Sequence, residues 1–518
     1  MSFWLSALLL AVGAEKDVRD LSLEDLLETP IAVASKAQAR TSRDTPGIVT
    51  TMSREEILAS GARDLLEVLQ LIPGFSFHTD VEGVVGAGFR GMWGHEGKVL
   101  LIVDGMEMNE LLYSTLQLGH HYPVQLIERV EVIRGPGSAV YGGNAELAVI
   151  NVITRGAKEL MGVEAGARYA HSHAGFYDWS GGVSAGWAFQ SGFEVAVNLG
   201  LGQGRRGHGT YTDFAGGTYT MGGASFIDPT LLDASVKWKG LQLKVLFDDY
   251  RVGSQDGYGL VSAAPANLRF RTWAADLRYR LDRWERVTPT AYLQWRLQQP
   301  WNVTDKASEL FYSKTATRLK GGVLVEARPL DGLELVGGLE GWGDLAWLDD
   351  AELVGTQTDF AGKSSVSYAN VAAFAQARWD NPWVNVSLGG RYEWNSQVGS
   401  NVAPRVALSK RIERLHVKLL AAGAFRSPGI ENINLNAGIR AEQTQVAEAE
   451  VGLQLNELFY VSMNAFYMRL SNPIVYGFDQ ASGDESYINA GPVATAGYEL
   501  ELQLRGKYGF ARATYSLV

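Results

Sequence analysis

The sequence predicts a mainly β protein in which a small α+β domain precedes a large antiparallel β-barrel that crosses a membrane. Three observations lead to this fold class. Glycine and aromatic residues are abundant, with 59 glycines, 14 tryptophans, 21 tyrosines and 19 phenylalanines among 518 residues, which suits strands joined by tight turns. Beyond Gly162, runs of roughly ten residues alternate apolar with polar side chains. Long insertions and very short turns alternate between these runs.

The composition excludes several functional classes. The formal net charge is −11 at pH 7, which argues against nucleic acid as a partner because phosphate binding needs a positive field. The chain has no cysteine, so disulfides, thiolate catalysis and cysteine metal sites are excluded. No His-Glu-x-x-His motif and no paired Cys-x-x-Cys site occurs, so we expect neither catalysis nor a cofactor.

The first 43 residues are expected to hold a leader and a polar N-terminal segment. Residues 3–14, FWLSALLLAVGA, are apolar but too short to cross a bilayer, and they end in small residues suited to signal peptidase. We therefore expect a signal peptide over residues 1–14, although no Lys or Arg precedes its apolar run. Residues 15–43 are polar and loosely patterned. No later segment reaches 18 consecutive apolar residues, so no transmembrane helix is expected.

Residues 44–157 are expected to form the small α+β domain. A strand is expected over residues 47–52, and Ser53 with Glu56 three residues later forms a capping box that begins a helix. A second helix is expected over residues 62–70. In residues 127–134, IERVEVIR, the alternation predicts a half-buried strand. A tight glycine turn then leads into another strand.

Residues 160–518 contain the alternating runs. In a soluble sandwich the apolar face of such runs points inward, whereas in a membrane barrel it points outward to lipid, and periodicity alone does not decide. The membrane barrel is favoured by aromatic residues at the ends of runs and by the alternation of loop lengths. The aromatic residues are Trp379, Trp383, Phe459, Tyr460 and Tyr467; the long insertions are residues 204–229, 349–365 and 426–440; the short turns are residues 239–240 and 331–332.

Seven motifs, in order along the chain, resemble those of TonB-dependent outer-membrane receptors. The most specific covers residues 127–155, IERVEVIRGPGSAVYGGNAELAVINVITR, and is similar to the signature of the plug domain that fills the barrel lumen in this family. The other motifs lie at residues 64–74, 89–91, 100–105, 403–408, 425–428 and 496–502. The resemblance assigns the plug signature to Asp104, Gly105, Glu128, Arg129, Glu131, Gly135, Gly137, Tyr141 and Gly142.

The number of strands differs from that of similar receptors. The alternating runs give roughly 17 strands, whereas bacterial barrels use an even number and plugged transporters have 22. The last run, residues 510–518, also lacks the terminal aromatic residue expected of the family. We therefore expect a barrel of the 22-stranded type that is incomplete at its C-terminal end. Either the sequence is a fragment, or the gene is truncated, or a partner subunit completes the barrel; a fragment is favoured.

The resemblance implies energised uptake of a scarce nutrient across the Gram-negative outer membrane, with the plug and N-terminus facing the periplasm. An extracellular ligand would bind the outer loops, while TonB and its inner-membrane motor complex would pull the N-terminal segment. The expected TonB box, residues 28–35, would pair by strand addition through Glu28, Thr29, Ile31, Ala32 and Val33. Pro30 lacks one donor, which leaves the register open. The alternative is that this segment is a linker.

Two rival functions remain at this stage, and the substrate is open. One rival is an outer-membrane scaffold or adhesion protein that kept the plugged barrel and lost import. The other is a soluble β-sandwich enzyme. Siderophores, cobalamin, haem and oligosaccharides are all compatible with the sequence, because the loop residues that would select among them follow no recognisable pattern.

In similar receptors, two plug arginines meet two barrel glutamates in a buried charge cluster. The resemblance implies this role for Arg90 and Arg134, with Glu450 and Glu499 as their partners. The alternation supports the assignment, because both glutamates lie on the polar face of their runs, which would line the lumen. Arginine suits such a cluster because its planar fork bonds two carboxylates in fixed geometry. The alternative is that all four are solvated lumen charges.

Two further features have functional and structural interpretations. Residues 135–143 are rich in glycine but lack the Gly-Lys-Ser/Thr ending of a phosphate-binding loop, so their glycines are better explained by positive φ angles and close backbone approach. His120 and His121 end the loop formed by residues 109–122. They are candidates for coordinating a metal or a metal-bearing ligand, but adjacent histidines in a polar loop are more often structural. We expect no metal site of the protein itself.

Overall fold

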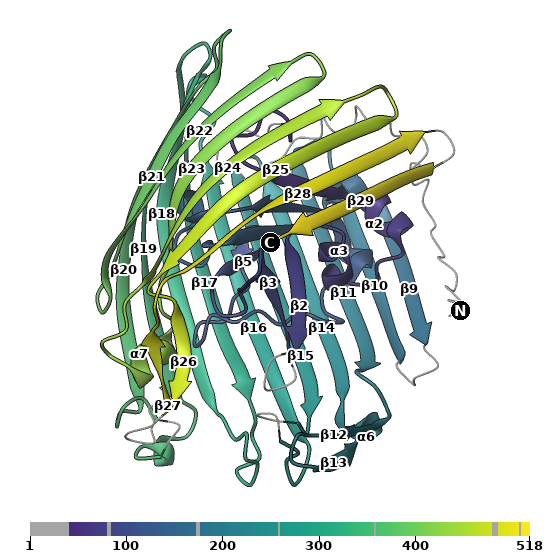
Figure 1. Cartoon of the computed structure of the whole chain (residues 1–518), viewed down its shortest axis with the longest axis vertical. Coiled ribbons are helices and arrows are strands. Elements are labelled where there is room, and N and C mark those ends of the chain that lie inside the picture. The colour runs from purple at the N-terminus through teal and green to yellow at the C-terminus, as the bar shows by residue number, and fades with distance from the viewer. Residues whose placement is uncertain are drawn as a thin grey trace.

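The computed structural model describes residues 41–79, 84–171, 177–256, 260–356, 359–478, 485–506 and 509–518. An N-terminal domain lies inside a large barrel, so it acts as a plug (Figure 1). The expected signal peptide and the expected TonB box both lie outside the described residues.

The plug is built on a mixed five-stranded sheet of order β1-β7-β8-β5-β6. Strand β8 runs antiparallel to β7 and parallel to β5, and most of its apolar residues are buried. The sheet strands are β1 (Val49–Ser53), β5 (Val99–Val103), β6 (Met106–Glu107), β7 (Ile127–Arg134) and β8 (Ala148–Thr154). A second, three-stranded sheet contains β2 (Phe75–Thr79), β3 (Val85–Phe89) and β4 (Met92–Trp93).

The plug helices are short, and their ends follow local capping. Helix α2 (Arg54–Ser60) begins at the predicted capping box, in which Ser53 and Glu56 bond each other's backbone N–H groups. Helix α3 (Leu65–Leu69) is shorter than the predicted 62–70, because the Asp64 side chain caps it by accepting the N–H of Glu67. Two four-residue helices, α4 (Ser138–Tyr141) and α5 (Ala157–Leu160), were not predicted.

Seventeen strands of the described chain make the barrel, which agrees with the number counted in the sequence. Neighbours pair antiparallel in sequence order from β9 to β29, and the strand order closes on β9. The expectation of further strands beyond Val518 stays a prediction. The strands are β9 (Gly162–His171), β10 (Tyr177–Ala188), β11 (Phe193–Arg205), β14 (Phe226–Trp238), β15 (Leu241–Ser254), β16 (Ala266–Arg280), β17 (Val287–Asn302), β18 (Lys314–Leu330), β19 (Leu333–Leu348), β20 (Ser365–Trp379), β21 (Asn385–Asn395), β22 (Gly399–Ile412), β23 (Leu415–Arg426), β24 (Glu442–Gln454), β25 (Phe459–Ser471), β28 (Val493–Gly506) and β29 (Gly509–Leu517).

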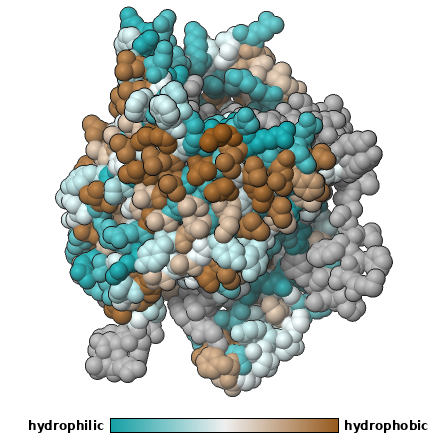
Figure 2. Space-filling view, turned by 45° about the horizontal axis from the view of Figure 1, so that its top comes forward, coloured by the Kyte–Doolittle hydropathy of each residue, from teal (hydrophilic) through white to brown (hydrophobic). Residues whose placement is uncertain are grey.

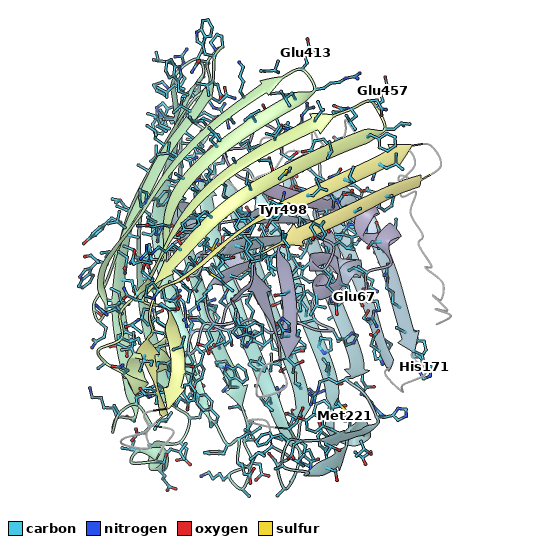
Figure 3. All side chains as sticks on the ribbon, viewed as in Figure 1. Glu67, His171, Met221, Glu413, Glu457 and Tyr498 are labelled. Atoms are coloured by element: carbon cyan, nitrogen blue, oxygen red, sulfur yellow. The ribbon has the colours of Figure 1, made fainter. Side chains whose placement is uncertain are left out.

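The two ends of the barrel differ in loop length, as predicted. The tight turns lie at one end, where Figure 3 places Glu413 and Glu457; His171 and Met221 lie at the other end. That second end carries long loops with elements of their own (Figure 1). These elements are β12 (Thr210–Thr212), β13 (Thr218–Thr220), α6 (Met221–Ala224), α7 (Ile430–Leu435), β26 (Ile474–Phe478) and β27 (Glu485–Asn489).

The barrel strands are apolar outside and polar inside. In β24, Glu448 and Glu450 are buried against the plug, whereas Val451 is 48% exposed. Hydrophobic side chains gather on the outer face (Figure 2). This is the inverse of a soluble sandwich and the arrangement of a transmembrane barrel. Within the described part of the chain, none of the helices has the length and apolar character needed to span a bilayer.

The aromatic residues predicted to form girdles are mostly exposed. Trp379, Trp383, Phe459 and Tyr467 all lie on the outer surface. Tyr460 was wrongly included, because strand alternation turns it into the lumen, where it is 7% exposed.

Candidate functional site

A buried ionic cluster joins the plug to β24 and β28. Arg90 follows β3, and its guanidinium lies 2.7 Å from the Glu448 carboxylate and 2.8 Å from that of Glu499. Arg134 ends β7 and lies 2.9 Å from Glu499 and 3.7 Å from Glu450. The structure therefore brings together all four residues predicted from the sequence, and they are buried rather than solvated.

Sequence reasoning missed two carboxylates of this cluster, Glu448 and Glu501, the second of which lies 3.6 Å from Arg134. Glu448 lies two residues before Glu450 on the same face of β24, so the alternation that placed Glu450 in the lumen also carried the signal for Glu448. The Arg90 guanidinium also lies 4.2 Å from the centre of the Phe466 ring. Each charge in the cluster stabilises the others, because removing one leaves its partners buried without a counterion.

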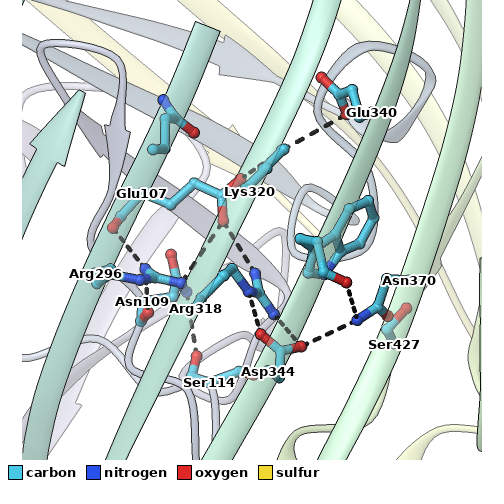
Figure 4. A network of polar contacts seen from close by, with 12 residues as sticks. Glu107, Asn109, Ser114, Arg296, Arg318, Lys320, Glu340, Asp344, Asn370 and Ser427 are labelled. Atoms are coloured by element: carbon cyan, nitrogen blue, oxygen red, sulfur yellow. Dashed lines mark hydrogen bonds and ion pairs between the residues drawn. The ribbon is translucent and has the colours of Figure 1, made fainter. Parts of the chain in front are cut away.

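A second ionic cluster, of reversed polarity, joins the plug to β17, β18 and β19 (Figure 4). Here the plug supplies the carboxylate, Glu107 at the end of β6, and the barrel supplies the cations. Arg296, Arg318 and Lys320 lie 3.9, 3.4 and 3.5 Å from that carboxylate. Burial alone would raise the pKa of Glu107, but these three cations lower it to about 2. The cluster was not predicted, and no motif marks it.

A third set of contacts holds the segment that leads into the plug. Three barrel cations from β20, β22 and β23 donate hydrogen bonds to backbone carbonyl oxygens of residues 42–47. The bonds join Lys418 to Ser42 at 2.6 Å and to Gly47 at 3.0 Å, Arg378 to Asp44 at 2.6 Å, and Arg405 to Pro46. Residues 42–47 are therefore docked on the barrel wall by main-chain recognition.

The glycines of the plug signature mark positions where the chain bends or where neighbours approach closely. Asp104 and Gly105 both have positive φ, and the Asp104 carboxylate accepts the N–H of Thr154 at 3.2 Å. Gly135 has φ +132°, and a Cβ there would lie 2.9 Å from Glu448. At Gly137 a Cβ would lie 2.4 Å from the Val149 side chain. These contacts support the structural interpretation of the glycine-rich stretch.

The charged residues of the signature bond within the plug or to nearby segments. Glu128 lies 2.9 Å from Arg155, and Arg129 lies 2.9 Å from Glu131, which is completely buried. Tyr141 and Gly142 end α4 against the barrel. Gly142 has φ +89°, and a Cβ there would lie 2.7 Å from a Glu393 carboxylate oxygen. These residues therefore fix the plug fold and its seat in the barrel.

The two candidate ligand histidines are packed at the plug–barrel interface. His121 has its ring nitrogens 2.8 Å from Asp248 and 2.8 Å from the carbonyl oxygen of Gln117. The His120 backbone N–H donates to Asp64 at 2.6 Å. Among the residues that the structure describes, no group of three His, Cys, Asp or Glu side chains could hold a metal ion. The positions of these histidines give the ligand hypothesis no support.

A large open cavity, which we call the vestibule, lies between the plug and the long loops. Its volume is about 2240 Å³. Plug residues such as Trp93 and Tyr113 line it together with loop residues such as Tyr476 and Tyr487. Cavities that bind drug-sized ligands measure roughly 300–1,000 Å³, so the vestibule has room for a considerably larger molecule.

Comparisons with known proteins agree with this architecture. The family model described as TonB-dependent Receptor Plug Domain matches residues 41–149, and the one described as TonB dependent receptor-like, beta-barrel, matches residues 335–517. The chain belongs to the TonB-dependent receptor family. This family consists of transporters and receptors rather than enzymes.

Relatives of this receptor with curated descriptions match over a limited region. The vitamin B12 transporter BtuB of Vibrio vulnificus is 39% identical over 119 residues, which is 22% of this chain and 18% of that protein. The iron-regulated outer membrane virulence protein of Vibrio cholerae is 31% identical over 131 residues, which is 24% of this chain and 20% of that protein. The matched segments thus span about a fifth of these relatives.

Solved structures share the fold over most of the receptor. A mutant of the ferric enterobactin receptor from Pseudomonas aeruginosa, in complex with enterobactin, has a TM-score of 0.71 at 19% identity, covering 92% of this chain and 81% of that one. The siderophore receptor PirA from Acinetobacter baumannii has a TM-score of 0.69 at 14% identity, covering 96% and 82%. At such identities the likeness shows the fold alone.

Proposed function

We propose that this receptor imports a scarce nutrient across the Gram-negative outer membrane, driven by TonB and its inner-membrane motor complex. The observation that carries the proposal is the combination of a plug held in the barrel by buried ionic clusters and a large vestibule above it. A ligand that enters the vestibule meets the plug, so its passage requires work on the plug. The nutrient belongs to the siderophore, cobalamin, haem or glycan classes.

The docked segment supports a role for the N-terminus in opening. Residues 42–47 lie near the tight-turn end of the barrel, where Arg43 donates to the carbonyl oxygen of Glu413 at 2.9 Å. In this proposal that end faces the periplasm, and residues 28–35, which precede the docked segment in the chain, pair there with TonB by strand addition. A pulling force on residues 28–35 would then act first on the hydrogen bonds that join residues 42–47 to Lys418, Arg378 and Arg405.

Deletion of residues 28–35 tests the proposal. We expect the deletion to abolish growth that depends on the receptor when iron, cobalamin, haem or a glycan limits growth, while the amount of receptor in the outer membrane stays unchanged. A control deletion of equal length within residues 15–27 should leave this growth intact. Equal growth of the parent and of the strain lacking residues 28–35 would instead favour a plugged scaffold or adhesion protein that does not transport.

A further inference from the structure

Cations and carboxylates both line the vestibule. Among the lining side chains that the structure describes there are four of each, so these side chains carry no net formal charge. The cations are Lys98, Arg206, Lys314 and Arg426, and the carboxylates are Glu96, Asp256, Glu309 and Glu431.

Each of the four cations is already paired with a carboxylate. Both terminal nitrogens of the Arg206 guanidinium donate hydrogen bonds to the Asp256 carboxylate, at 2.8 and 3.0 Å. Lys314 is almost fully buried and lies 2.5 Å from Glu431. Arg426 and Lys98 share a buried carboxylate that does not itself line the vestibule. It belongs to Glu442, which lies 2.7 Å from Arg426 and 3.5 Å from Lys98.

Aromatic rings supply much of the remaining wall. Tyr113, at the apex of the plug, has its ring centre 6.2–6.4 Å from those of Trp301, Tyr312 and Tyr487. Trp301 lies at the end of β17, Tyr312 in the loop that follows it, and Tyr487 in β27. Tyr476 is half exposed and lies 5.3 Å from Tyr487. Such rings offer apolar faces together with hydroxyl groups that donate and accept hydrogen bonds.

We propose that the vestibule selects a ligand without net charge, bound by ring faces and neutral polar groups, and that it discriminates against polyanionic complexes. The inference rests on the proposed function, because it names the class of molecule that the receptor takes up. An anion that approached Arg206 or Lys314 would also be repelled by the carboxylate that already pairs with that cation. To gain the cation it would have to displace that carboxylate and leave it unpaired.

The test compares two ferric complexes of similar size that differ in charge, a neutral ferric trihydroxamate and a trianionic ferric tris-catecholate. Dissociation constants are measured by tryptophan quenching of the purified full-length chain in detergent at low salt. We expect the neutral complex to bind at least tenfold more tightly than the trianion. Asp256→Asn releases Arg206 and should tighten binding of the trianion at least tenfold.

Two further variants make the outcome decisive. Glu431→Gln releases Lys314 on a different part of the wall and should have the same effect, so the test survives if one variant does not fold. Asp282→Asn is the matched control. It releases Arg280 from an exposed pair at 2.7 Å outside the vestibule and should leave both dissociation constants unchanged.

Several results would overturn the inference. The inference is wrong if the wild-type receptor binds the trianion as tightly as the neutral complex. It is also wrong if the Asp256→Asn and Glu431→Gln variants fold but gain no affinity for the trianion. If neither complex binds the wild type, a gain of trianion binding in the variants supports the inference and no gain refutes it. Binding to purified protein needs no TonB, so loss of uptake with this selectivity intact would refute only the proposed transport.

Discussion

Buried arginines carry much of the contact between the plug and the barrel. Arg90 has no exposed surface and two carboxylate partners, Glu448 and Glu499, within 2.8 Å. Taking such charges out of water is costly, and only the complete set of partners offsets that cost. The cluster is therefore sensitive to the loss of any one member.

Arg90→Ala should lower the free energy of unfolding of the plug by about 3–5 kcal/mol, because it leaves two glutamates buried without their counterion. The measurement is urea unfolding of the purified receptor, followed by tryptophan fluorescence. Arg280→Ala is the control, since its ion pair with Asp282 is exposed and contributes little. Equal midpoints for Arg90→Ala and wild type would show that the cluster does not hold the plug.

Glu146 makes plug stability depend on pH. Burial, and then the nearby Glu442 carboxylate, raise the pKa of Glu146 to about 8 from an ordinary 4.5. The folded plug therefore binds this proton more tightly than the unfolded chain does, and the stabilisation is lost as pH rises from about 4.5 to 8. Glu146→Gln cannot ionise, so its melting temperature should fall less than that of wild type between pH 5 and pH 8.5. Parallel melting curves would contradict this assignment.

The sequence could predict part of the charged site and not the rest. Arg90, Arg134, Glu450 and Glu499 were found because motifs and strand alternation both mark them. Glu107 was not found, because its partners lie in β17 and β18, about 190 to 210 residues further along the chain. Alternation says that Arg296, Arg318 and Lys320 face the lumen, but not which plug residue they meet.

At the scale of elements, the strands were more predictable than the helices. Strand β7 occupies the residues predicted for it, and the turns at residues 239–240 and 331–332 are both present. Helix α3 was predicted too long because Asp64 was assigned to its interior, whereas it caps the helix. Helix α4 spans four residues within a glycine-rich turn, too few for a helical period to be visible.

The capping box predicts the behaviour of α2. Ser53→Ala removes the bond between the serine hydroxyl and the Glu56 N–H, and should destabilise this helix by about 1 kcal/mol. Amide hydrogen exchange in residues 54–60 should then quicken roughly fivefold, while exchange in β7 stays unchanged. Ser53→Thr keeps a capping hydroxyl and should restore most of the protection. Slow exchange in the alanine variant would mean that packing alone fixes α2.

At the scale of the whole molecule, the number of barrel strands and the order of the domains followed from the sequence. Alternation alone did not give the direction of the apolar face, which only the aromatic residues and loop lengths favoured as outward. Alternation has the same period whichever face is wet. The plug decides it, because charged strand faces meet plug residues such as Arg90 and Glu107 inside the cylinder. Outward-facing Leu339 is accordingly 69% exposed in the absence of lipid.

Leu339 and Leu330 provide a test of the lipid-facing surface. Leu339 lies within β19, and Leu330 ends β18 beside a tight turn; both are more than 60% exposed. Leu339→Arg should destabilise the barrel in bilayers by about 2–4 kcal/mol and Leu330→Arg by at most about 1 kcal/mol, since the penalty depends on depth. Unfolding in lipid vesicles measures both. Equal small effects would place this surface in water.

The hold on residues 42–47 has a consequence for how this stretch can change. Lys418, Arg378 and Arg405 donate hydrogen bonds to backbone carbonyl oxygens, which every amino acid carries. These bonds therefore do not depend on the side chains of the residues that accept them. Substitutions in residues 42–47 that keep the backbone path leave these bonds intact, although a change of Arg43 would also lose its own bond to the Glu413 carbonyl oxygen. The three cations are constrained instead. They lie far from residues 42–47 in the sequence, and no sequence pattern marks their role.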